Sequence, residues 1–137
     1  MEAVIFKRLI LLAVGCVMFG GQATRVKKED LLAHYEQYNG TSVIVAGEVA
    51  SESEMTIMYL PSSLKDPDAE EGMLITLSEA ISKKPGTLER RFIKTLKRAN
   101  RVDAVLAGRF ESAPDRRWGN QACCRFRLQV EHVLELK

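Results

Sequence analysis

The sequence predicts an α+β fold, mainly β with helices, in which five strands form a small barrel. Five segments alternate apolar and polar residues, as half-buried strands do; they cover residues 41–51, 54–60, 72–77, 102–112 and 123–136. A helical pattern separates the third segment from the fourth. Gly47 and Gly108, inside the two long strands, indicate the strong bends with which a small barrel closes.

A short helix is expected before the first strand, over residues 27–38 (KKEDLLAHYEQY). Leu31, Tyr35 and Tyr38 fall on one face at helical spacing. An Asn-Gly pair then ends the helix, because glycine accepts the left-handed conformation found at helix ends.

The second helix, TLERRFIKTLKRANR, is expected to be capped by Thr87. Leu88, Phe92 and Leu96 recur at four-residue spacing and form one apolar stripe. The rest of the helix carries five basic residues, Arg90, Arg91, Lys94, Lys97 and Arg98. Their surface is either simply solvated or makes contact with anionic lipid headgroups or an acidic partner.

Two adjacent cysteines begin the last strand, and side-chain alternation separates them. Cys124 falls on the same face as the apolar residues Phe126, Leu128, Val130, Leu134 and Leu136. Cys123 falls on the opposite, polar face, so the two thiols do not chelate one metal ion. Cys124 is expected to be a small core residue, whereas Cys123 is expected to point outward, where an oxidising compartment would allow it to bridge two chains.

The expected order is a helix, three strands, a helix and two strands. From the first strand onward this is the order of an OB-fold, a five-stranded barrel. Three stretches also resemble small uncharacterised bacterial exported proteins of OB-like build: GEVASESEMTIMY, LERRFIKTLKR and VLAGRFESAPDRRWGNQACCRFRLQVEHV. The resemblance covers about residues 40–135. It implies the fold and export, and it assigns no activity to any residue.

Residues 1–23 have the layout of a secretory signal. Two basic residues precede an apolar run, Leu9 to Gly21, of 13 residues. At about 1.5 Å per residue this run is too short for a comfortable membrane span. Cleavage before Thr24 would follow Gly21-Gln22-Ala23, which has small residues at the positions that cleavage requires.

A second processing route uses Leu12-Ala13-Val14-Gly15-Cys16, which resembles a bacterial lipobox with Cys16 as the lipidated residue. Ala13 stands where leucine is usual. An uncleaved anchor is the third alternative. Either main route places a single domain, residues 24–137, outside the cytoplasm, as a periplasmic or secreted protein or a membrane-anchored lipoprotein.

The charge of the chain is unevenly distributed although its formal net value is only +2. Residues 27–82 carry three basic and eleven acidic side chains, a net of −8. Residues 83–101 carry eight basic and one acidic, a net of +7. Such a bipolar molecule can orient a partner. The mean charge gives no reason to expect general affinity for nucleic acid.

The loop between the last two strands carries the candidate ligand site. Arg116 and Arg117 stand beside Trp118, the only tryptophan, and OB-folds commonly bind ligands with this loop. One interpretation is a platform that stacks on a sugar, peptide or nucleotide. The other is a tryptophan folded over the barrel end, with both arginines in solvent.

Two arginines of the last strand extend the candidate site. Arg125 and Arg127 share an outward face with Arg109 of the preceding strand and could form one basic patch with the basic helix. Pairing across strands with Glu48 or Glu131 is the alternative.

Enzyme motifs are nearly absent. Residues 62–65 match S-x-x-K without the S-D-N and K-T-G partners of that motif. His34 and His132 lie in unrelated elements, so no metal or cofactor is expected. The sequence favours a noncatalytic OB-like binding domain of the cell envelope, whose partner is a small ligand or an envelope protein. The alternatives are a lipid-anchored structural or assembly lipoprotein, tethered through Cys16, and a domain that binds single-stranded nucleic acid.

Overall fold

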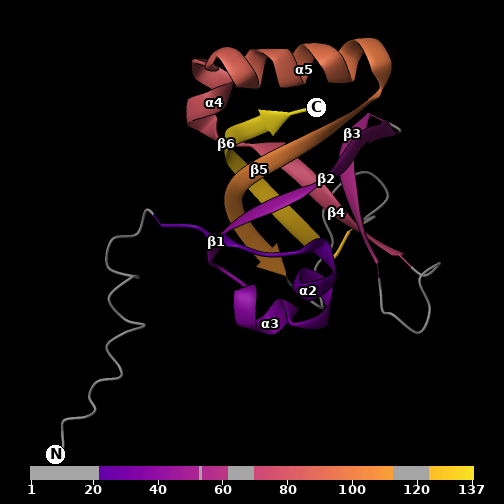
Figure 1. Ribbon diagram of the computed structural model, residues 1–137, viewed down its shortest axis with the longest axis vertical. Coiled ribbons are helices and arrows are strands. Elements are labelled where there is room, and N and C mark those ends of the chain that lie inside the picture. Colours follow the sequence, from indigo (N-terminus) through magenta and orange to yellow (C-terminus); the bar gives the residue numbers. More distant parts are fainter. Residues whose placement is uncertain (1–21, 53, 62–69, 113–123) are drawn as a thin grey trace, which may run out of the picture.

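The computed structural model describes residues 22–52, 54–61, 70–112 and 124–137. Its elements are β1 (Thr24–Arg25), α2 (Lys28–Ala33), α3 (Tyr35–Tyr38), β2 (Ser42–Glu52), β3 (Met55–Pro61), β4 (Glu70–Leu77), α4 (Glu79–Lys83), α5 (Thr87–Ala99), β5 (Arg101–Ser112) and β6 (Phe126–Leu136). Helix α5 lies across one end of the sheet, and α2 and α3 lie at the opposite end (Figure 1).

The strands form a closed five-stranded barrel. They pair in the order β2, β3, β4, β6 and β5, and β5 pairs back onto β2. Only the β4–β6 pair of the barrel is parallel, and β1 adds a short parallel strand beside β2. The predicted OB-like barrel, with a helix between its third and fourth strands, is therefore confirmed.

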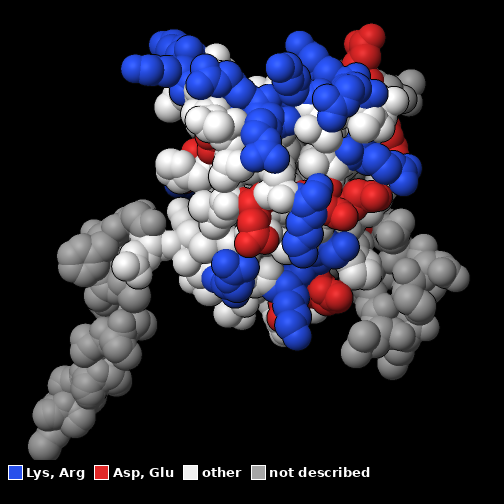
Figure 2. Space-filling view, turned by 45° about the horizontal axis from the view of Figure 1, so that its top comes forward, with Lys and Arg blue, Asp and Glu red and all other residues white. Residues whose placement is uncertain are grey.

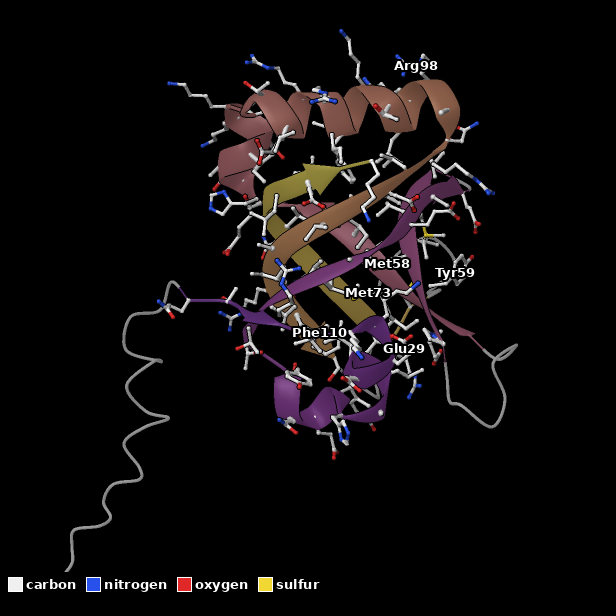
Figure 3. The ribbon with its side chains drawn as sticks, viewed as in Figure 1. Glu29, Met58, Tyr59, Met73, Arg98 and Phe110 are labelled. Atoms are coloured by element: carbon white, nitrogen blue, oxygen red, sulfur yellow. The ribbon has the colours of Figure 1, made fainter. Side chains whose placement is uncertain are left out.

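The barrel interior is filled by large apolar side chains, as the alternation along each strand predicts. Met58, Met73 and Phe110 are fully buried, and Figure 3 shows them between the barrel walls. The ring of Phe110 stacks on that of Phe126, with centroids 5.9 Å apart. Tyr35 of α3 meets Phe126 edge-on at 5.5 Å. The Tyr35 contact joins α3 to the barrel core.

The N-terminal helix is split into two, which corrects the single helix expected over residues 27–38. The break falls at His34, whose backbone leaves helical geometry (φ −128°, ψ 40°). Leu31 is fully buried, and Tyr35 and Tyr38 pack against the core. The predicted apolar face is thus correct, but the chain bends at His34 as it covers the barrel end.

Two helix starts differ from the expectation. Helix α4 was not expected from the sequence, and Ser78 caps it by accepting a hydrogen bond from the Ile81 amide at 3.3 Å. Helix α5 has Gly86, not Thr87, as its N-cap. The Gly86 carbonyl already accepts the first helical hydrogen bond, from Arg90, at 2.9 Å. Thr87 is therefore the first helical residue, and its side chain does not cap the helix.

Two irregularities in β6 change which of its residues face the core. The pairing with β5 skips Glu131 and Leu134, so each forms a bulge. Val133 is consequently 3% exposed and Leu134 is 42% exposed. The prediction that Leu134 continues the core face is wrong, whereas Leu136, beyond the second bulge, packs on the core as expected.

Cys124 is buried as predicted, at 1% exposure, but it does not lie with Phe126. A bend at Arg125 separates Cys124 from the start of β6. Its sulfur lies 3.4 Å from where a Cβ on Gly72 would stand. Because Met73 points inward, this position is on the outer face of β4. The Cys124 sulfur is also in a disulfide, whose partner lies outside the described residues, as does Cys123.

Candidate functional site

The solvent side of α5 is strongly basic. Phe92 and Leu96 turn inward and are buried, whereas five exposed cations form what we call the basic face: Arg90, Arg91, Lys94, Lys97 and Arg98. Figure 2 shows lysine and arginine side chains gathered over this helix, and Figure 3 shows Arg98 on the side of α5 that faces away from the barrel. The amphipathic pattern of the sequence predicted this arrangement.

No carboxylate in the described part of the chain forms an ion pair with the basic face. The one acidic residue of α5, Glu89, turns toward the barrel. Its Oε2 accepts a hydrogen bond from the main-chain N–H of Val133 at 2.8 Å. The charge of the basic face is therefore not neutralised by its own helix.

An open hollow of about 490 Å³ lies along the basic face. Its lining combines apolar or uncharged residues with four of the five cations: Pro85, Thr87, Ile93, Arg90, Arg91, Lys94 and Lys97. We call it the basic hollow. Because its charged lining is entirely cationic, it favours anions.

A second concavity, the α5 groove, lies between the helix and the adjacent barrel end and has a volume of about 360 Å³. Its apolar lining is Ile75, Leu77, Phe92, Ile93 and Leu96. Its polar lining is Ser51, Thr56, Lys97 and Asn100. The Ser51 amide donates to the carbonyl of Asn100 at 2.9 Å, which fixes the end of α5 against β2.

The basic hollow and the α5 groove are neighbours, because Ile93 and Lys97 line both. Ile93 is half-buried and Lys97 is exposed. The partly apolar α5 groove thus adjoins the cationic surface of the same helix. The sequence did not reveal the groove, since Ser51, Thr56 and Ile75 come from three strands that only barrel closure brings beside α5.

Arg125 and Arg127, two of the predicted site residues, are half-buried and ion-paired. Arg125 donates from Nε to Glu71 Oε1 at 3.0 Å, and its guanidinium lies over the Phe126 ring. Arg127 donates from Nε to Glu111 Oε1 at 2.8 Å. The partners are thus neither Glu48 nor Glu131, and a ligand at these arginines would compete with a carboxylate already in place.

Arg109 lies beside this second pair. Its Nε is 4.0 Å from Glu111 Oε2, so one carboxylate serves both Arg109 and Arg127. Arg116, Arg117 and Trp118 lie outside the described residues, and so does Cys16. A ligand site at that loop stays a prediction.

OB-folds commonly use the outer face of this strand, β3, to bind ligands. Here a carboxylate, that of Glu52, lies beside its aromatic residue, Tyr59. The Tyr59 hydroxyl donates to Glu52 Oε1 at 2.6 Å. A carboxylate at this point repels phosphate and so does not favour nucleic acid there. Among the described residues no group of three or more His, Cys, Asp or Glu side chains is placed to hold a metal ion.

Comparisons with known proteins assign no family. No protein-family model matches the chain, and a search of curated proteins found no match. One of the solved structures that match is described as "OBody AM3L09 bound to hen egg-white lysozyme". It is 17% identical, the match covers 74% of this chain and 88% of that chain, and the TM-score is 0.40. None of the helices in the described residues has the length and hydropathy of a membrane-spanning segment.

Proposed function

We propose that the protein is an exported, noncatalytic OB-like binding domain of the cell envelope, and that the basic face of α5 receives an anionic partner. The observation that carries the proposal is that five exposed cations on one helix have no carboxylate partner among the described residues. The arginines of the barrel wall, in contrast, are paired with glutamates. Export is supported by the signal-like residues 1–23.

The spacing of the cations strengthens the argument. Arg90 and Lys94 are four residues apart, as are Lys94 and Arg98. Like charges at this spacing repel and destabilise a helix by about 0.2–0.5 kcal/mol per pair. An anionic partner would relieve that repulsion. If the helix were only solvated, the repulsion between these cations would bring no benefit.

Retention on immobilised heparin, eluted with a salt gradient, tests the proposal. The double variant Arg90→Glu/Lys94→Glu reverses two of the five charges of the basic face. The control Arg25→Glu/Lys27→Glu makes the same change in net charge at exposed positions near the start of the domain. We expect the α5 variant to elute at clearly lower salt and the control to elute close to wild type, because screened surface charges act locally. Equal shifts, or no retention of the wild type, would contradict the proposal.

A lipid-anchored structural or assembly role is the second candidate, and the stretch Leu12-Ala13-Val14-Gly15-Cys16 favours it. The intact mass of protein from the membrane and soluble fractions of its host separates the two. A chain that begins at Cys16 with added acyl mass would establish the tether. A soluble chain that begins at Thr24 would exclude it.

A further inference from the structure

We propose that the anionic partner is a single-chain amphiphile, whose apolar chain enters the α5 groove and whose carboxylate or phosphate binds Lys97. This inference rests on the proposed function and names the ligand class for it. It is carried by the juxtaposition of an apolar groove and a cationic surface that share two residues, Ile93 and Lys97.

The lining of the groove matches an apolar chain. Small-molecule sites are mostly apolar concavities of about 300–1,000 Å³ with a few placed polar groups. The α5 groove, at about 360 Å³, lies at the small end of that range, which limits the occupant to a small apolar group such as a single chain. Leu77 and Ile93 are only half-buried in the groove, so an apolar occupant would remove their remaining exposed surface from water.

The sign of the ligand's charge follows from Lys97, the one charged residue among the described residues that line the groove. Its side chain belongs equally to the basic hollow, where Arg90, Arg91 and Lys94 add three further cations. No described carboxylate forms an ion pair with these side chains. A carboxylate or phosphate at the groove would therefore lie beside cations that no described carboxylate neutralises, whereas a cationic head group would be repelled.

The test is calorimetric titration of the protein purified from its host with three C12 probes below their critical micelle concentrations. Dodecanoate and dodecyl phosphate carry the proposed head groups, and dodecyltrimethylammonium carries the same chain with opposite charge. We expect the two anions to bind with 1:1 stoichiometry and the cation not to bind. Equal binding of all three probes, or of none, would overturn the inference.

Two lysines of α5 give a matched pair of variants, because Lys97 lines the groove and Lys94 lines only the basic hollow. Lys97→Glu should weaken dodecanoate binding about tenfold or more, the loss expected when a charge-assisted hydrogen bond is removed. Lys94→Glu makes the same change in net charge and should weaken binding by less than about threefold, as a more distant screened charge does. Equal effects would mean that only the overall charge matters, and the groove assignment would fail.

Filling the groove separates this inference from the proposed function. Thr56→Trp, or Ser51→Phe if the first variant unfolds, should abolish binding of dodecanoate and leave heparin retention unchanged. Thermal unfolding of each variant checks that the barrel is intact. If phosphatidylglycerol vesicles bind the wild type but dodecanoate does not, the basic face docks on a surface and the groove is not the site. If heparin retention is also independent of the α5 charges, the proposed function itself fails.

Discussion

Glu89 of α5 accepts a hydrogen bond from the main-chain N–H of Val133 at 2.8 Å. The contact joins the helix to β6 at the bulged stretch, where the strand ladder is irregular. A half-buried carboxylate therefore serves as the acceptor for an amide of the irregular strand. This bond also holds the basic face of α5 in its orientation over the barrel end.

Removing this acceptor should destabilise the protein. Glu89→Ala is expected to lower the free energy of unfolding by about 1.5–3 kcal/mol, the range for hydrogen bonds to charged groups. Glu89→Gln keeps an acceptor oxygen and should cost less. Urea unfolding measures both. Glu79→Ala is the control, because its ion pair with Lys83 is exposed and is worth at most about 1 kcal/mol; an equal loss in the control would refute the argument.

Gly108 should not tolerate a side chain. A Cβ at this position would lie 2.2 Å from the carbonyl oxygen of Gln129, and main-chain atoms cannot rotate away. We expect Gly108→Ala to lower the free energy of unfolding by about 3 kcal/mol or more, the upper range for overpacking. At Gly47 the nearest atoms belong to the side chains of Lys28 and Met58. Gly47→Ala should therefore cost less than about 1.5 kcal/mol, as tolerated core changes do.

The bulge at Leu134 predicts unequal costs for two neighbouring substitutions. Val133→Ala deletes buried methyl groups and should cost about 1–2 kcal/mol. Leu134→Ala acts on an exposed side chain and should stay within about 0.5 kcal/mol. Thermal or urea unfolding of the two variants decides, and the reverse order would mean that β6 runs without the bulge.

Half-buried and exposed arginine–glutamate pairs should contribute unequally to the stability of the protein. Arg127 and Glu111 are both more than two-thirds buried, whereas Arg101 and Glu48 are mostly exposed and 3.8 Å apart. Arg127→Ala should cost about 1–3 kcal/mol because it leaves Glu111 partly desolvated. Arg101→Ala should cost at most about 1 kcal/mol. Urea unfolding at low and high salt measures both, and the same small loss at each position would contradict the difference in burial.

The sequence predicted the features that depend on regular alternation. Val102, Leu106 and Phe110 all lie on the core face of β5, because nothing interrupts the strand's inward parity there. The prediction failed at Leu134, where the register of β6 shifts. The positions of bulges depend on how the barrel closes, and no single residue of β6 predicts them.

The candidate site also has parts that the sequence predicted and parts that it did not. The basic face of α5 follows from helical periodicity alone, so Arg90 and Lys94 could be placed on the solvent side. The α5 groove could not, because Thr56 and Lys97 are 41 positions apart in the chain and meet only through packing. Arg125 shows a third case, since the bend at this residue interrupts strand parity and its guanidinium lies over Phe126.

The place of β6 in the barrel has a consequence for the order of folding. This strand follows every other described strand and pairs with both β4 and β5. The barrel therefore cannot close until β6 has been synthesised. The contacts that close it join residues far apart in the sequence, and such contacts slow folding. Before β6 is present, the other strands cannot form a closed barrel. We expect a chain that ends before β6 to remain unfolded, because β4 and β5 would then each keep an unpaired edge.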